Sequence, residues 1–329
     1  MRKTRLQNRI SGSMFTLPVC AVITLLLWGF PLREGEGIFL SRLSFTVPHL
    51  VALVCVALIA YVLVEMNNVN MLIRVRSRLV SSVWLVSAAV VPLLHTYSHG
   101  LVAAVCLSVA YYQLFKTYQA PGSQLNAFHS ALMLSAGSLF VPHLLFFLPF
   151  FLWHQTVFLR SVTLRSLGAV LLGLAMPFVV VAGYAMVSGD LSFLFRWAET
   201  LSLYYAVSSE AYQTLTLQQW ASWAVISLWG WIGMVHYLST SYRDRIQTRM
   251  LLYVFVCQFL AIETFVALQP QHLDDWLPLL MVTASPLTAH FFALTGSRFT
   301  NALFLVALLS FCALGVLGFW QVDLRFLSC

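Results

Sequence analysis

Charged residues are scarce in this sequence. Asp, Glu, Lys and Arg make up only 9% of its 329 residues, whereas they make up about a quarter of an ordinary soluble domain. Hydrophobic residues make up 60%, and the mean hydropathy is +0.85. A soluble core cannot bury that much apolar surface, so the composition excludes an ordinary soluble protein and predicts a membrane protein.

Several catalytic motifs are absent as well. The sequence has no P-loop, no GxSxG and no HExxH pattern, which argues against nucleotide hydrolysis, an elbow serine hydrolase and an ordinary zinc protease. It has no evident inverted repeat, the usual sequence support for a transporter. The cysteines show no CxxC spacing, and most lie within apolar runs, where they are expected to pack as small hydrophobic residues.

Long apolar runs recur along the chain. Because a helix needs about 20 apolar residues to cross a bilayer, these runs predict an all-α polytopic transmembrane helical bundle, formed as one domain over residues 1–329. We expect ten or eleven spans, eleven in the preferred map, with the amino terminus inside. They cover residues 14–31, 48–64, 79–94, 101–115, two short spans within 127–152, and then 166–187, 219–237, 250–268, 276–294 and 301–320.

The run at residues 127–152 can cross once as a long kinked helix or twice as a short helical hairpin. Pro142 lacks a backbone donor and disfavours helical geometry in Val141, so a turn is natural there. The hairpin places Arg160, Arg165 and the later basic loop at residues 243–249 inside the cell, as the positive-inside rule requires. We therefore predict a turn at Pro142.

In this predicted topology the basic and acidic residues lie mostly on opposite sides of the membrane. Of the 18 Lys and Arg residues only Arg33, Arg42, Arg196 and Arg325 fall outside, so the positive net charge reflects orientation, and nucleic-acid binding is not expected. Acidic residues gather outside, which indicates that chemistry would occur on the outer face. Residues 191–218 carry aromatic and charged residues among leucines and are expected to form an outer interfacial amphipathic segment.

Two kinds of acidic residue are candidates for chemistry. Glu34 and Glu36 stand in the first outer loop, where a carboxylate can act as a general base toward an incoming hydroxyl; the alternative is a solvated loop. Glu263 is the one acid inside an apolar run, which is costly without a partner or water. It is either a functional group or the acceptor of a hydrogen bond from a serine or tryptophan inside the bundle.

Histidines and acids also meet near the predicted outer boundary: His95, His99, His143 and His272, with Asp274 and Asp275. Such side chains could hold a divalent metal. They come from different loops without HxxxH or HxH spacing, however, so interfacial hydrogen bonding is the preferred interpretation. His95, His99, Asp274, Asp275 and also Glu263 are candidate substrate-binding residues on this basis. We predict no metal site and no cofactor.

A central stretch carries a family resemblance. The segment SAGSLFVPHLLFFLPFFLW, followed by RSVTLR and SLGAVLLGLAMPFVVVAGYAM, resembles the central part of GT-C-type membrane glycosyltransferases over about residues 126–186. The chain also looks like an uncharacterised family of bacterial polytopic membrane proteins. The GT-C resemblance implies sugar transfer from a polyprenyl-phosphate donor on the outer face, with Glu34 or Glu36 at the catalytic acidic position.

The leading hypothesis is therefore a GT-C-like glycosyltransferase of a bacterial inner membrane. Arg33, Arg42 or Arg196 would neutralise the donor phosphate, and Trp197, Tyr204 or Tyr205 would stack on a sugar ring. One alternative is a permease or proton-linked carrier in which Glu263 titrates. Another is a non-catalytic subunit of an envelope assembly machine. Membrane lipids are expected contacts in every case, and other envelope membrane proteins are expected partners in the last.

Overall fold

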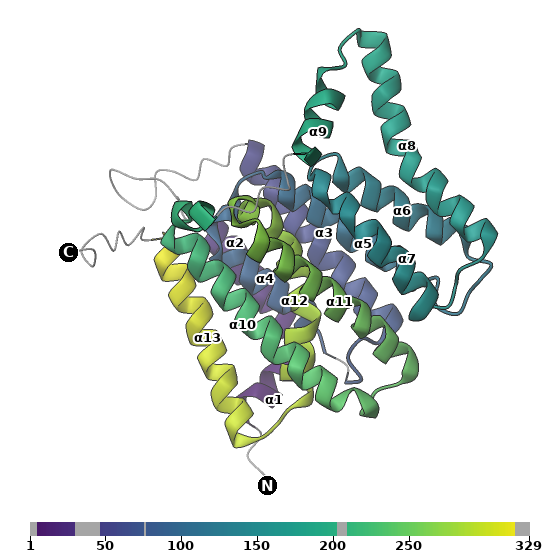
Figure 1. The fold of residues 1–329 in the computed structure, drawn as a ribbon. Helices are drawn as coiled ribbons and strands as arrows, with labels where there is room; N and C mark the ends of the chain where they lie inside the picture. Colours follow the sequence, from purple (N-terminus) through teal and green to yellow (C-terminus); the bar gives the residue numbers. More distant parts are fainter. Residues whose placement is uncertain (1–4, 30–46, 76, 203–208, 320–329) are drawn as a thin grey trace, which may run out of the picture.

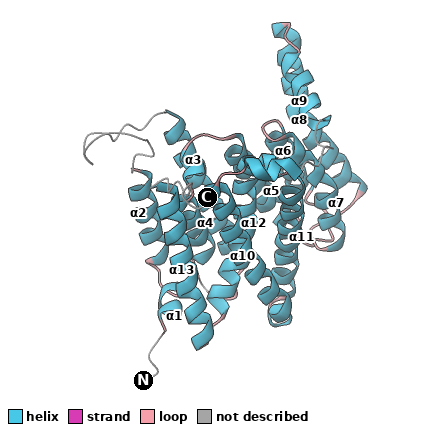
Figure 2. Ribbon diagram, turned by 60° about the vertical axis from the view of Figure 1, so that its left-hand side comes forward, coloured by secondary structure: helices cyan, strands magenta, loops and turns pink. Residues whose placement is uncertain are grey.

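The computed structural model describes residues 5–29, 47–75, 77–202 and 209–319, and every regular element within them is helical (Figures 1 and 2). Short 3-10 helices (η) join several α-helices. The α-helices are α1 (Leu6–Ser11), α2 (Thr16–Trp28), α3 (Val47–Asn70), α4 (Leu79–Val90), α5 (His99–Phe115), α6 (Gln124–Ser138), α7 (Leu148–Val157), α8 (Leu164–Ser188), α9 (Ser192–Ser202), α10 (Leu217–Thr240), α11 (Ile246–Leu268), α12 (Leu273–Leu294) and α13 (Arg298–Phe319). The predicted all-α class is confirmed for this part of the chain.

Five helical segments are long and apolar enough to cross a membrane: Val47–Asn70, Leu164–Ser188, Ile246–Leu268, Pro270–Leu294 and Arg298–Gly318. Shorter apolar helices cover Thr16–Trp28, Leu79–Val90 and His99–Phe115. These helices identify a membrane protein. The count of eleven spans and the sidedness of the loops stay predictions.

Helix α12 is the centre of the bundle and contacts α4, α5, α10 and α11. After Asp275 its one ionisable residue is the buried His290, and two of its three hydroxyl groups donate to its own carbonyls. The Thr283 hydroxyl donates to Leu280 O at 2.9 Å, and that of Ser285 donates to Met281 O at 2.6 Å. Because these polar atoms are satisfied within the helix, α12 can be buried on nearly all sides.

The hairpin region doubles back within the bundle. Helix α6 ends at Ser138, and the 3-10 helix η2 (Pro142–Phe147) leads into α7. Val141 has an extended backbone (φ −123°, ψ 93°), as expected before a proline. After α7, Leu159 O accepts a hydrogen bond from Gln119 N at 2.8 Å. The chain therefore returns to the end of the bundle where α6 began.

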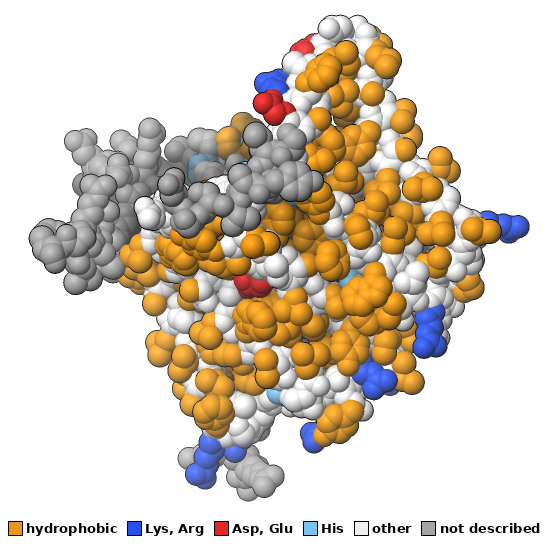
Figure 3. All heavy atoms as spheres, viewed as in Figure 1, with side chains coloured by type: hydrophobic (Ala, Val, Ile, Leu, Met, Phe, Trp, Pro, Cys, Tyr) orange, Lys and Arg blue, Asp and Glu red, His pale blue; other side chains and the backbone are white. Residues whose placement is uncertain are grey.

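Contacts between connecting segments define two ends of the bundle. At one end, Asp275 Oδ1 accepts from Gly100 N at 3.2 Å, joining the start of α12 to the start of α5. At the other, Ser77 Oγ donates to Ser11 O at 2.7 Å. We call the first the outer end and the second the inner end, after the sides that the sequence predicts. Figure 3 shows Lys and Arg at the margins of one face, outside its broad apolar area.

Helices α8 and α9 project from the bundle (Figures 1 and 2). The first half of α8 packs on α6, where Ser135 Oγ donates to Leu174 O at 2.6 Å. Helix α9 returns to the bundle, and Trp197 Nε1 donates to Ser138 O at 2.7 Å. The predicted segment 191–218 thus contains α9 and the 3-10 helix η4 (Ser209–Thr214); its interfacial position stays a prediction.

Helix α10 approaches the backbone of α12 at Gly233. A Cβ atom there would lie 2.5 Å from the carbonyl carbon and oxygen of Leu287. We expect Gly233→Ala to push the two helices apart and to destabilise the bundle by about 1–3 kcal/mol, the usual cost of overpacking. Thermal unfolding in detergent, followed by circular dichroism, measures this loss.

Gly168→Ala on α8 is the matched control, since a Cβ built there has nothing within 4 Å beyond its chain neighbours and its own helix backbone. Its melting temperature should equal or exceed that of the wild type. Equal melting temperatures for Gly233→Ala and Gly168→Ala would contradict the close approach of α10 to α12.

Candidate functional site

Part of the predicted site falls outside the described residues. These positions are the two acids of the first outer loop, Glu34 and Glu36, the arginines Arg33 and Arg42, and the tyrosines Tyr204 and Tyr205. Their proposed roles therefore depend on the sequence. The remaining predicted site residues all lie in described segments.

Asp274 and Asp275 lie in the first turn of α12, where acidic side chains are favoured by the helix dipole. Asp275 reaches across to the first turn of α5 and accepts from Gly100 N. The approach is close, because a Cβ at Gly100 would lie 2.2 Å from Asp275 O. Asp275 thus joins two helix starts, which is a structural contact at the predicted site.

Asp274 is held by the start of α10. Thr216 and Gln219 form a capping box there: Gln219 Oε1 accepts from Thr216 N at 2.8 Å, and Thr216 Oγ1 accepts from Gln219 N at 3.3 Å. The side-chain amide of Gln219 then donates to Asp274 Oδ1 at 2.6 Å. The capping box therefore holds the Gln219 side chain in place, and Gln219 in turn holds the Asp274 carboxylate.

Glu263 lies beside the same helix. Trp223 stands four residues after Gln219, on the same face of α10, and its Nε1 donates to Glu263 Oε2 at 3.0 Å. Glu263 is buried. The hydrogen bond from a tryptophan inside the bundle is the structural alternative that the sequence suggested for this acid, and it does not exclude a second role.

Aromatic rings continue from Trp223 toward the outer surface. The Trp220 ring lies 5.5 Å from that of Trp223, and the Tyr212 ring is stacked on Trp220 at 5.8 Å. Tyr212 is fixed by a hydrogen bond from its hydroxyl to Ala267 O. We call Tyr212, Trp220 and Trp223 the outer aromatic row; it ends on the Glu263 carboxylate, and Trp220 is 37% exposed.

The predicted histidines have packing contacts. His95 stacks on Trp28 at 4.1 Å, and its Nε2 lies 3.1 Å from Ala89 O. Burial lowers the pKa of His95 to about 4, so this side chain is neutral near pH 7. The His99 ring lies 5.7 Å from Tyr97. Among the described residues, no three His, Cys, Asp or Glu side chains are grouped to hold a metal ion.

Arg196 and Trp197 lie on α9. The exposed Arg196 guanidinium bonds to Ser192, with Nε 3.3 Å from its carbonyl oxygen and an Nη atom 3.2 Å from its Oγ. The Trp197 indole meets Phe178 edge-on at 4.9 Å and holds α9 against Ser138. Phosphate binding by Arg196 and sugar stacking by Trp197 stay predictions.

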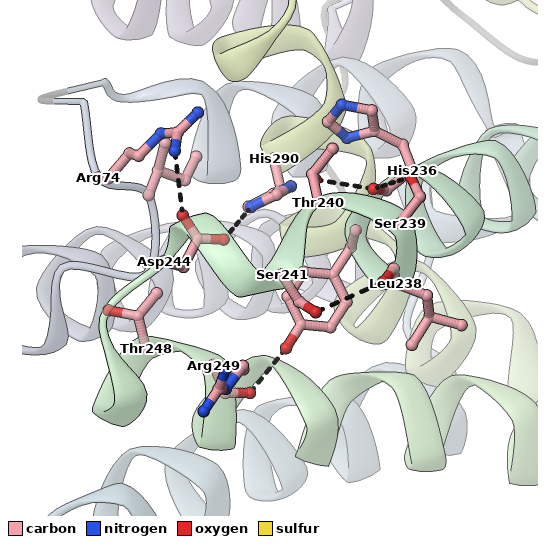
Figure 4. Close-up of polar contacts among 12 residues, drawn as sticks. Arg74, His236, Leu238, Ser239, Thr240, Ser241, Asp244, Thr248, Arg249 and His290 are labelled. Atoms are coloured by element: carbon pink, nitrogen blue, oxygen red, sulfur yellow. Dashed lines mark hydrogen bonds and ion pairs between the residues drawn. The ribbon is translucent and has the colours of Figure 1, made fainter.

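A second polar cluster, at the inner end, was missed by the sequence analysis. His290 Nε2 lies 3.0 Å from Asp244 Oδ2, and Arg74 lies 3.9 Å from Asp244 Oδ1 (Figure 4). The side chains of His290 and Asp244 are 0% and 1% exposed, and that of Arg74 is 38% exposed. We call these three residues the inner charge cluster; it joins the α3–α4 connection, the α10–α11 connection and α12.

His236 lies beside this cluster, with its ring 5.7 Å from that of His290. One signal in the sequence could have found part of it: His290 is an ionisable residue inside an apolar run, which marks a candidate by default. Asp244 gives no such signal, because it stands between arginines in a loop. Its partners are 46 and 170 positions away, at His290 and Arg74.

Comparison with known proteins does not assign the chain to a family. No family model, curated protein or solved structure matches the chain. Function is therefore inferred from the residues of the outer end and from the resemblance to GT-C-type glycosyltransferases.

Proposed function

We propose that this protein transfers a sugar from a polyprenyl-phosphate donor to an acceptor hydroxyl at the outer face of a bacterial inner membrane. The acceptor oxygen would attack the anomeric carbon, and the bond from that carbon to the phosphate oxygen would break. Polyprenyl phosphate would then leave. Glu34 or Glu36 would accept the hydroxyl proton, and the nearby arginines would neutralise the leaving phosphate.

The observation that carries the proposal is the outer aromatic row ending on a carboxylate. Aromatic faces stack on the C–H face of a sugar ring, and a carboxylate accepts hydrogen bonds from sugar hydroxyl groups. Trp220 offers a partly exposed ring, and Glu263 lies one ring further in. An interfacial aromatic belt alone would not need the buried acid.

The described residues on either side of the first outer loop are linked by contacts to the start of α10, where the outer aromatic row lies. Trp28 Nε1 donates to His49 O at 3.4 Å, so the end of α2 and the start of α3 meet. Trp28 also stacks on His95, the last residue of the 3-10 helix η1 (Pro92–His95). Pro92 lies against Gly318 of α13, and a Cβ built at Gly318 would lie 3.4 Å from Gln218 Nε2. These contacts lead from the loop's flanks to the start of α10.

Binding of a polyprenyl-phosphate hexose to the purified protein in nanodiscs tests the proposal. We expect Trp220→Ala to weaken binding about 2- to 12-fold, because one aromatic contact contributes about 0.5–1.5 kcal/mol. Trp153→Ala is the matched control, since Trp153 is 44% exposed on α7 and outside the row. The proposal fails if no polyprenyl-phosphate hexose binds, or if the two variants bind equally.

Glu263→Gln separates this proposal from the alternatives. As a sugar ligand, Glu263 affects affinity, and Glu34 and Glu36 remain essential. In a proton-linked carrier, Glu263→Gln would abolish solute flux while the outer-loop acids are dispensable. In a non-catalytic assembly subunit, replacement of Glu263 and replacement of the outer-loop acids would both be tolerated, and specific envelope proteins would co-purify.

A further inference from the structure

A groove separates α10 from α13 near the inner end. It is a largely open groove of about 400 Å³, and its lining consists of Trp231, Ile232, Val235, His236, Phe291, Phe299, Thr300 and Leu303. All but two of these side chains are apolar. Trp231, Val235 and Phe299 are exposed, so the groove opens on the side of the bundle and not into its core.

Water is a poor occupant of this groove. A groove of this volume would hold several waters, and each ordered water needs two to four polar partners. The lining offers two polar side chains, and Thr300 Oγ1 already bonds to Ser297 O at 3.2 Å. An acyl chain from the bilayer needs no polar partner and fills the groove with van der Waals contacts to its apolar lining.

The inner end of the groove is positively charged. Arg298 is exposed at the first position of α13, directly before the lining residues Phe299 and Thr300. The connection from α12 to α13 contains no acidic residue. The amino end of α13 adds the positive end of its helix dipole. The buried Nδ1 atom of His236 has no hydrogen-bond partner within the described part of the chain.

We propose that this groove binds one acyl chain of an anionic glycerophospholipid from the surrounding bilayer. The chain lies between α10 and α13, and the phosphate contacts Arg298 at the start of α13. Charge complementarity selects the headgroup, because juxtamembrane basic residues attract anionic lipids. This site is at the opposite end of the bundle from the proposed sugar site and is independent of it.

Native mass spectrometry of the protein released from nanodiscs tests the proposal. The nanodiscs contain equal amounts of phosphatidylglycerol and phosphatidylethanolamine with identical acyl chains. We expect the wild type to retain phosphatidylglycerol preferentially. Leu303→Trp and, as an independent second variant, Val235→Trp fill the groove and should lower the retained lipid severalfold. Leu309→Trp, at a 68% exposed position of α13 outside the groove, should leave it unchanged.

The headgroup contact has its own control. Arg298→Ala should lower the preference for phosphatidylglycerol about fivefold, while Arg243→Ala, at another exposed base of the inner end, should preserve it. Equal retention by the groove-filling variants and Leu309→Trp would overturn the groove as the site. Equal retention of the two lipids by the wild type would overturn the choice of an anionic lipid.

Discussion

Replacing Glu34 and Glu36 together by glutamine should lower the rate of sugar transfer by about 10²- to 10⁴-fold, the usual contribution of a general base. Glutamine keeps the size and the hydrogen-bonding oxygen of glutamate but cannot accept the proton of the acceptor hydroxyl. The affinity for the polyprenyl-phosphate hexose should change little, because the proton moves only during the reaction. Single-turnover transfer and equilibrium binding, measured on the same preparation, separate the two effects.

Glu65→Gln is the control for this pair. Glu65 lies near the inner end of α3, and its carboxylate forms no hydrogen bond or ion pair among the described residues. Its variant should transfer sugar at the wild-type rate. Unchanged transfer by the Glu34/Glu36 double variant would exclude both acids as the base and would favour the carrier or the assembly subunit.

Helix positions could be predicted from the sequence because apolar runs, prolines and basic loops are local signals. The turn at Pro142 follows from one missing donor and one restricted neighbour, and the extended backbone of Val141 shows that restriction. The span count is harder. Several helices are shorter than a bilayer crossing, and the sequence alone does not say how far each one extends.

The site was predicted less completely, because its contacts join distant residues. Asp275 was a candidate substrate-binding residue, and the structure shows it bonded to Gly100 N, 175 positions away. The outer aromatic row was not expected either: Tyr212 lay in the predicted interfacial segment, and Trp220 and Trp223 began a predicted span. Only the tertiary packing of α10 on α11 brings Trp223 to Glu263.

We expect the largest loss of stability from a substitution in the inner charge cluster. Asp244→Ala should destabilise the protein by about 3 kcal/mol, the lower end of the range for breaking a buried pair. The lower end applies because the partly exposed Arg74 can be solvated when its partner is lost. His290 remains fully buried and loses the acceptor at 3.0 Å from its Nε2. Titration with a denaturing detergent measures the free energy of unfolding.

A double-mutant cycle with His290→Ala separates the pair from the general cost of truncation. Once Asp244 is gone, removing His290 should cost about 1 kcal/mol less than in the wild type, because the two side chains share one contact. Glu65→Ala controls for the loss of an acid that has no partner among the described residues, and it should leave stability nearly unchanged. Strictly additive losses at Asp244 and His290 would show that the two residues act separately, and that the inner loops are held together by other contacts, such as Thr248 Oγ1 donating to Met71 O at 3.1 Å.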